Sequence, residues 1–230
     1  RLARPMSFGL VASLEAYHSS HLADAQIDRD RFGTFVSSGI GGFSTIYEEM
    51  KKVFLLGPDR VSPFFVPNVI TNMVSGQIAI KFQAKGPALA IVTACASATS
   101  AIGEAFRYIR DGYLELALAG GAEAGINPAG VAGFAAMKAI SPSLDPTRAS
   151  IPFDAERTGF VIAEGAGILI LEELEHARRR GAKIHGEIIG YGTNCDAFHI
   201  TQPDETAESI IKCMKLALND ARIAPESIDY

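Results

Sequence analysis

The sequence predicts a layered α/β protein, and three observations support this fold class. Segments with the apolar spacing of a helix alternate along the chain with short apolar runs typical of strands. Most of these runs carry little charge, as expected of strands that are buried on both faces of a sheet. Many of the 22 glycines fall at apparent element ends. The 230 residues form one large domain or part of a larger one.

Amphipathic helices account for about half of the predicted elements. Their approximate ranges are 5–18, 43–56, 68–81, 98–110, 128–139, 172–181 and 207–221. Asn68 is expected to cap the third helix, and Gly112 to close the fourth. Asn127 followed by Pro128 is a typical start for the fifth, because proline is tolerated at the first helical position.

Short apolar runs predict the strands. They lie within 33–42, 88–92, 114–121, 165–173 and 183–192. The run 114–121, LELALAGG, is expected to end at its two glycines. Together with 88–92 and the helix between them, it predicts a right-handed parallel crossover.

Composition excludes several classes of protein. The formal net charge of −5 argues against nucleic acid as a partner, no apolar run is long enough to cross a membrane, and no signal peptide is recognisable. The three cysteines, Cys95, Cys195 and Cys213, have neither a disulfide-framework nor a metal-site spacing. We therefore expect no metal and a reducing, cytoplasmic setting.

Cys95 stands at the joint between a predicted strand and a predicted helix, in GPALAIVTACASATSAIG (86–103). A single cysteine beside a strand is most often a small buried apolar residue. Here, however, the first turn of the helix offers unpaired N–H groups and the positive end of its dipole, which favour the thiolate. The neighbouring side chains are small and leave room for a substrate. These features favour a nucleophile for acyl groups.

The same segment closely resembles the β-ketoacyl-acyl-carrier-protein synthases, the condensing enzymes with the thiolase fold. The resemblance rests on VTACASATSAIGEAFRYIRDG, on ALAGGAEAGINPAGVAGFAAMKAIS, and on SSGIGG, SPFFVPNVITNM, PFDAERTGFVIAEGAGILILEE and DAFHITQPD. It runs along essentially the whole chain. The segments FFVPNVITNM and GFAAMKAIS look more like the synthase II type than the synthase I type.

The resemblance implies the fold and the reaction. The fold would be a layered αβαβα thiolase-like one, of which 1–230 form the N-terminal half and the start of the second half. Cys95 would take an acyl chain from acyl carrier protein and condense it with malonyl-acyl carrier protein, with loss of CO2. The substrates would be carried on phosphopantetheine, and no further cofactor is implied.

The chain departs from the family pattern at its ends. Two histidine segments of the family, resembling HGTST and GHxxGAAG, are absent, and so is the later glycine-rich loop. We therefore expect residues 1–230 to be an incomplete N-terminal synthase domain, about two thirds of the family length and shortened at both ends. On their own, they are not expected to condense two substrates.

Further site residues follow from the resemblance. Ile40 and Phe134 match positions that line and gate the acyl pocket, and Phe65 matches a residue that reaches into the pocket of the partner subunit. The alternatives are a strand-end apolar residue for Ile40 and core packing for the two phenylalanines. Thr201 matches a residue that binds the pantetheine arm, while the family often has TSP where this chain has TQP. We interpret His199 as structural.

The partners also follow from the resemblance. Acyl carrier protein is strongly acidic, so a synthase of net negative charge needs local positive charge at its docking site. Arg4, Arg60 and Lys138 match such positions, with ordinary solvated charges as the alternative. Lys138 is expected one helical turn after Phe134, on the same face. The 88–94 strand is expected to pair with its copy in a homodimer.

Other functions compete with this interpretation. A degradative thiolase shares the fold and the cysteine but acts on coenzyme A thioesters. A polyketide ketosynthase shares the chemistry. A non-catalytic paralogue, such as a chain-length factor, would bind a partner subunit only, although such factors lack the cysteine.

Overall fold

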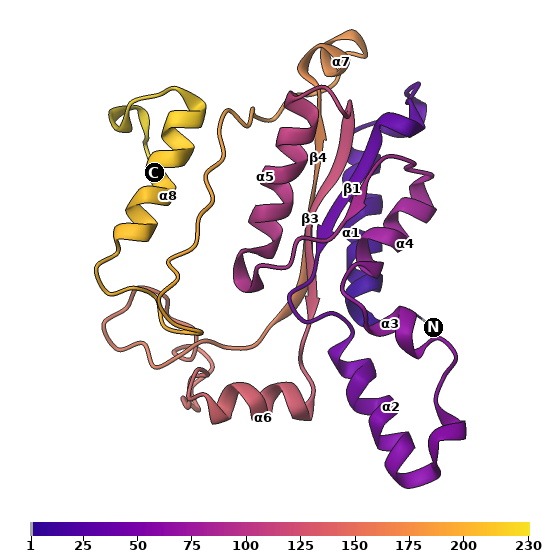
Figure 1. Ribbon diagram of the computed structural model, residues 1–230, viewed down its shortest axis with the longest axis vertical. Helices are drawn as coiled ribbons and strands as arrows, with labels where there is room; N and C mark the ends of the chain where they lie inside the picture. Colours follow the sequence, from indigo (N-terminus) through magenta and orange to yellow (C-terminus); the bar gives the residue numbers. More distant parts are fainter. Residues whose placement is uncertain (1) are drawn as a thin grey trace. The chain divides into compact units, whose positions relative to one another are not determined.

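A four-stranded mixed sheet forms the centre of the fold in the computed structural model, which describes residues 2–230 (Figure 1). Its strands are β1 (Phe32–Ser37), β2 (Ala88–Leu89), β3 (Leu116–Ala124) and β4 (Glu164–Glu172). Their order is β2-β1-β3-β4. β1 pairs in parallel with both β2 and β3, whereas β4 runs antiparallel to β3. The predicted parallel crossover is confirmed, with β1 between its two strands.

Eight α-helices accompany these strands in the described residues. They are α1 (Arg4–Ser19), α2 (Phe43–Leu56), α3 (Phe65–Val69), α4 (Met73–Phe82), α5 (Ser97–Arg110), α6 (Pro128–Ala136), α7 (Leu174–Arg179) and α8 (Glu208–Ala221). The predictions for α1, α2, α5, α7 and α8 are confirmed within a few residues. None of the helices in residues 2–230 combines the length and the apolar character that crossing a bilayer requires.

Helices cover both faces of the sheet, as the charge-poor strands predicted. α1 and α4 pack on one face, and α5 packs on the other (Figure 1). Because side chains alternate along a strand, β3 directs Leu116 and Leu118 to the α1 and α4 side and Ala117 and Ala119 to the α5 side. The small alanines let the axis of α5 lie close to the sheet.

Close contacts between α1 and α4 leave no room for a larger residue at Gly9. A Cβ placed on Gly9 of α1 would lie 2.9 Å from Val74 Cγ1. Between α4 and β1, the fully buried Ser75 hydroxyl donates to the Thr34 carbonyl oxygen at 2.8 Å and lies 2.9 Å from the Thr34 hydroxyl. These contacts fix α4 against the sheet.

The predicted helix 68–81 is wrong at its start, because the chain forms two helices there. Ile70 follows α3 with extended backbone angles, and α4 begins at Met73. Asn68 therefore lies inside α3 and does not begin the helix α4. Its Oδ1 instead accepts a hydrogen bond from the Ala3 N–H at 2.9 Å, which ties α3 to the beginning of α1.

Two strand predictions also need correction. β3 continues through Gly120 and Gly121 to Ala124, because its pairing with β4 extends to that residue. In the described chain, the predicted strand 88–92 pairs only at Ala88–Leu89. Beyond them, the Ile91 N–H donates to the Ser37 hydroxyl oxygen at 2.9 Å rather than to a strand carbonyl.

The chain forms two compact units, the first ending at His176 and the second running from Ala177 to Tyr230. In the second, 183–192 was predicted as a strand but pairs with no other strand of the described chain. It lies against α8 instead. A Cβ on Gly190 would stand 2.6 Å from the Ala217 carbonyl oxygen, so only glycine permits this approach.

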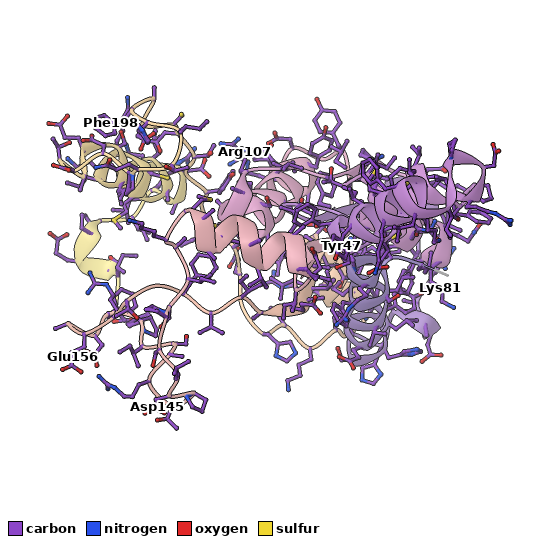
Figure 2. The ribbon with its side chains drawn as sticks, turned by 90° about the horizontal axis from the view of Figure 1, so that it is seen from below. Tyr47, Lys81, Arg107, Asp145, Glu156 and Phe198 are labelled. Atoms are coloured by element: carbon purple, nitrogen blue, oxygen red, sulfur yellow. The ribbon has the colours of Figure 1, made fainter. Side chains whose placement is uncertain are left out.

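A long exposed loop connects α6 to β4 within the first unit. Arg148 pairs there with Glu156 at 2.6 Å and Asp154 at 3.4 Å. Figure 2 shows Asp145 and Glu156 projecting from this loop, away from the helices that cover the sheet. The Thr147 hydroxyl and then its N–H lower the pKa of Asp145 by hydrogen bonding to its carboxylate.

Ser13 of α1 generates a test of the core. Its hydroxyl is fully buried and has no hydrogen-bond partner among the described residues. We expect Ser13→Ala to raise the free energy of unfolding by about 1 kcal/mol, because it removes an unsatisfied polar group. Urea unfolding measures the change.

Ser75→Ala is the matched control for this substitution. It removes a buried serine hydroxyl that is hydrogen bonded, and we expect it to lower the free energy of unfolding by about 1–3 kcal/mol. A loss of stability in Ser13→Ala would contradict the proposed origin of the gain.

Candidate active site

Cys95 is exposed and lies in a short turn between the sheet and α5. The 3-10 turn Ala94–Ala96 leads directly into α5. Its neighbours are small, as the sequence indicated. An exposed cysteine in this position is not a core residue, so the packing alternative loses its support.

The turn before Cys95 contains a backbone conformation that alanine rarely adopts. Ala94 has a φ of 50°, in the left-handed region, which costs an L-residue about 1–2 kcal/mol. Such conformations persist only where the surroundings hold them. Here the buried Ser97 hydroxyl accepts from the Thr93 N–H at 2.9 Å and donates to the Ala94 carbonyl oxygen at 2.7 Å. Ser97 therefore braces the turn from inside.

The loop after β1, residues 38–42, adjoins this turn; we call it the pocket loop. A Cβ on Gly39 would lie 3.6 Å from the Ala94 carbonyl oxygen, and a Cβ on Gly42 only 1.9 Å from the Asn68 carbonyl oxygen. The pocket loop thus touches both α3 and the turn Ala94–Ala96, which we call the nucleophile turn for the role expected of Cys95. Ile40, at its centre, is half-buried, and its Cδ1 would stand 2.9 Å from a Cβ on Gly125.

Phe65 is the first residue of α3 and is half-buried. The segment before it is held by Glu49 of α2, whose carboxylate accepts from the Ser62 N–H at 2.8 Å and from Lys52 Nζ at 2.5 Å. Because the pocket loop contacts α3, the structure brings the segments of Cys95, Ile40 and Phe65 together.

Phe134 lies on α6, which begins as the sequence predicted. The Asn127 Oδ1 accepts from the Gly130 N–H at 3.0 Å, and its Nδ2 donates to Ser44 Oγ at 3.3 Å. The start of α6 is therefore anchored beside the start of α2. Phe134 is half-buried and meets the ring of Phe160 edge to face, with centroids 5.3 Å apart. Sequence reasoning missed Phe160, and no local pattern marked it.

The predicted common face of Phe134 and Lys138 is wrong. α6 ends at Ala136, two residues before Lys138, which has a left-handed φ of 56°. The Lys138 N–H donates to the Ala135 carbonyl and the Ala139 N–H to the Phe134 carbonyl, at 2.9 and 3.1 Å. These two bonds close the helix and turn the chain away. Lys138 is exposed beyond that end.

The other predicted docking cations differ in their surroundings. Arg60 is exposed in the 3-10 turn that follows α2. Arg4 is also exposed, but its guanidinium pairs with the largely buried Glu164 and lies over the ring of Phe8. The Glu164 Oε1 also accepts from the Ile126 N–H at 3.0 Å. Arg4 therefore has a structural role at the start of α1.

Thr201 lies exposed in the second unit. Its N–H and that of Gln202 donate to His199 Nδ1 at 3.2 and 3.1 Å. His199 thus accepts two hydrogen bonds from its own loop, in agreement with a structural interpretation. No set of three or more His, Cys, Asp or Glu side chains in residues 2–230 is arranged to hold a metal ion.

Comparison with known proteins places this arrangement in a class. Over 99–100% of this chain it superposes on two solved structures with a TM-score of 0.92. One is a β-ketoacyl synthase from Burkholderia phymatum, 34% identical. The other, 32% identical, is a type II polyketide ketosynthase in complex with its acyl carrier protein and bound to the hexaketide. The fold is therefore the thiolase-like α/β fold of the ketosynthases, as predicted.

The chain belongs to the β-ketoacyl synthase family. Residues 2–177 match its N-terminal domain and residues 185–230 its C-terminal domain. Over its full length the chain is 44% identical to 3-oxoacyl-[acyl-carrier-protein] synthase 2 of Synechocystis, and it is 43% identical over 98% of its length to that of Coxiella burnetii. It spans 56% and 55% of those two relatives.

The contacts of Glu49 lead to a prediction about how the stability of the fold depends on pH. The Lys52 ammonium and then the Ser62 N–H hold the pKa of Glu49 below its ordinary value. Because the folded pKa is the lower one, Glu49 stabilises the fold above the unfolded glutamate pKa of about 4.3, and this stability is lost as the pH falls through the folded value. We expect Glu49→Gln to lower the melting temperature at pH 7 and to match the wild type in acid.

Thermal unfolding followed by circular dichroism across this pH range measures the effect. Glu48→Gln changes the charge of the exposed neighbouring residue and serves as the control. If the difference between Glu49→Gln and the wild type were the same at every pH, the carboxylate of Glu49 would not be its source.

Proposed function

We propose that Cys95 is the nucleophile of a 3-oxoacyl-acyl-carrier-protein synthase that takes an acyl chain from acyl carrier protein. The observation that carries this proposal is the exposed thiol on a strained, internally braced turn at the start of a 14-residue helix. Relatives that carry this name match the chain from end to end. The N–H groups and the dipole at a helix start favour the negative charge that develops on the thioester carbonyl oxygen during acyl transfer.

The proposed first step is acyl transfer. The Cys95 thiolate attacks the thioester carbonyl of the acyl carrier, and the negative charge moves to the carbonyl oxygen. The Cys95 backbone N–H helps to hold this oxyanion. The carbon–sulfur bond to pantetheine then breaks, the pantetheine thiolate takes up a proton, and the acyl chain stays on Cys95.

The proposed second step is condensation. A malonyl carrier loses CO2, and the resulting enolate attacks the Cys95 thioester. Cys95 leaves as the thiolate, and the product is a 3-oxoacyl carrier two carbons longer. The thioester converts the meeting of two acyl groups into a reaction within one site.

The acyl chain is proposed to lie along the pocket loop and α6, and Phe65 of α3 is proposed to reach into the pocket of the partner subunit. Ile40, Phe65 and Phe134 are half-buried. The pocket loop contacts α3 and the nucleophile turn, and Gly125, which precedes α6, lies beside Ile40. Thr201 is proposed to hydrogen bond the pantetheine arm. Substrates carried on phosphopantetheine require no separate cofactor.

The partner proposed for the chain is acyl carrier protein. Arg60 and Lys138, both exposed, supply the local positive charge that a protein of net charge −5 needs for an acidic partner. Arg4, already paired with Glu164, contributes less. One structural relative is a ketosynthase in complex with its acyl carrier protein, which supports this kind of partner.

Three further assignments belong to the same proposal. The 88–94 segment pairs with its copy in a homodimer, which is supported by the exposed apolar Leu89 and Val92 at the edge of the sheet. The chain combines the N-terminal synthase domain with the beginning of the C-terminal one. The protein acts in the cytoplasm, which suits its three free cysteines.

A polyketide ketosynthase is the second candidate, because one structural relative is such an enzyme at 32% identity. The 44% identity to fatty-acid-type synthases favours the first. A chain-length factor or a coenzyme A-dependent thiolase has no specific support among the described residues.

The decisive prediction concerns Cys95 itself. After incubation with a long-chain acyl carrier, we expect the intact protein to gain one acyl group by mass spectrometry, and peptide mapping to place it on Cys95. Cys95→Ser should reduce the adduct below detection, because a hydroxyl at this site is a much weaker nucleophile than a thiolate.

Cys195→Ser is the matched control, since Cys195 is also an exposed cysteine but lies far along the chain in the second unit. An adduct that persists in Cys95→Ser, or that moves to Cys195, would refute the assignment. Acyl transfer from coenzyme A alone, without a carrier, would favour the thiolase alternative.

Docking gives a second prediction. Reversing Arg60 and Lys138 to Glu should raise the KM for acyl carrier in Cys95 acylation by about tenfold at low salt, and less at high salt, because screening weakens the attraction. Lys85→Glu, an exposed lysine that precedes β2 at the opposite end of the parallel strands, is the control. An unchanged KM would remove both residues from the docking site.

A further inference from the structure

Glu123 is a carboxylate inside an otherwise small and apolar strand. It lies in β3, one residue before the strand ends at Ala124. Its Oε1 accepts from the Ser38 hydroxyl at 2.8 Å and its Oε2 from the Gly39 N–H at 2.8 Å. Both partners belong to the pocket loop, and neither is a cation.

Ser38 extends this restraint to Gly41. It is 2% exposed, and while its hydroxyl donates to Glu123 its oxygen accepts from the Gly41 N–H at 2.9 Å. Glu123 therefore fixes the backbone on both sides of Ile40, directly at Gly39 and through Ser38 at Gly41.

Any movement of the pocket loop would disturb the two segments that it contacts. Gly39 adjoins the Ala94 carbonyl of the nucleophile turn, and Gly42 donates to the Val69 carbonyl oxygen of α3 at 3.1 Å. A shift of the loop would change the gap between Ile40 and the segments of Cys95 and Phe65.

We propose that Glu123 is a positioning residue that holds the pocket loop and thereby sets which acyl chain lengths Cys95 accepts. This inference rests on the proposed function. Glu123 does not touch the reacting atoms; it acts through Ile40. A carboxylate suits the task because it can accept both hydrogen bonds at once, whereas an amide has only one acceptor oxygen.

Chain length is the property that separates this role from a general structural one. An acetyl group ends near the thiol, whereas a long chain must pass the residues that line the pocket. Loss of Glu123 leaves the Gly39 N–H and the buried Ser38 without their partner, at a cost that the loop relieves by moving. The long chain then loses its fit, and the acetyl group does not.

The test compares acetyl and long-chain acyl carriers as donors to Cys95, with rates of adduct formation measured by intact mass. For Glu123→Ala we expect the long-chain rate to fall about tenfold, as loss of a charged acceptor implies, and the acetyl rate to fall less than about threefold. Glu123→Gln should recover only part of the long-chain rate, since its single amide oxygen can accept from Gly39 but not also from Ser38.

Two further variants complete the design. Ser38→Ala removes the relay to Gly41 and should shift the ratio of the two rates in the same direction. Glu48→Ala makes the same change of charge at an exposed position of α2 and should leave the ratio unchanged. Circular dichroism checks that each variant is folded. If Glu123→Ala does not fold, the two single variants Ser38→Ala and Glu123→Gln provide the test.

Alkylation of Cys95 by iodoacetamide distinguishes the two ways of failing. If the wild type is alkylated but accepts neither acyl group, the proposed function is wrong, and the inference fails with it. If the wild type is acylated but the variants slow both donors equally, or slow neither, the role of Glu123 is overturned while the function stands.

Discussion

The close approach of α5 to the small-residue face of β3 is the constraint on which the site depends. A Cβ on Gly121 would lie 2.9 Å from Ala98 Cβ, so no side chain fits between the strand and the first turn of the helix. Ala101 and Ala105 continue this contact and are fully buried. The start of α5 is therefore placed by packing rather than by loop geometry, and Cys95 is placed with it. A larger residue at Gly121 would displace the helix start and the thiol together.

Polar groups then refine what packing has placed. Ser97 holds the nucleophile turn, Glu123 holds the pocket loop, and Glu164 links the start of α1 to the segment before α6. Each of these side chains is mostly shielded from water and is satisfied by backbone N–H groups, hydroxyls or an ion pair, so none leaves an unpaired acceptor. Because the contacts are short and directional, they fix backbone positions that apolar packing alone leaves loose.

The sequence predicts the helices whose apolar spacing is clear, such as α1, α2 and α5. It also indicates Cys95 as the candidate nucleophile, because that thiol stands at a strand–helix joint. It does not predict features that pairing between distant segments decides. β3 passes through two glycines because β4 continues beside it, and 183–192 has strand composition but no strand to pair with in the described chain. The Ser38–Glu123 contact joins residues 85 positions apart. In the sequence, the only indication of this contact is the carboxylate within LALAGGAEA, since a carboxylate is rarely buried without partners.

The edge of the sheet adds one more physical consequence. Within the part of the chain that the structure describes, β2 pairs on one side only, and the segment that follows leads through the exposed Val92 to the nucleophile turn. An unpaired apolar edge invites another strand, and the Ile91 N–H is already held by Ser37 Oγ at 2.9 Å. A partner strand along 88–94 would therefore stiffen the same few residues that position Cys95. The proposed pairing of 88–94 with its copy would therefore also order the backbone that leads to Cys95, because only Thr93 stands between Val92 and the strained Ala94.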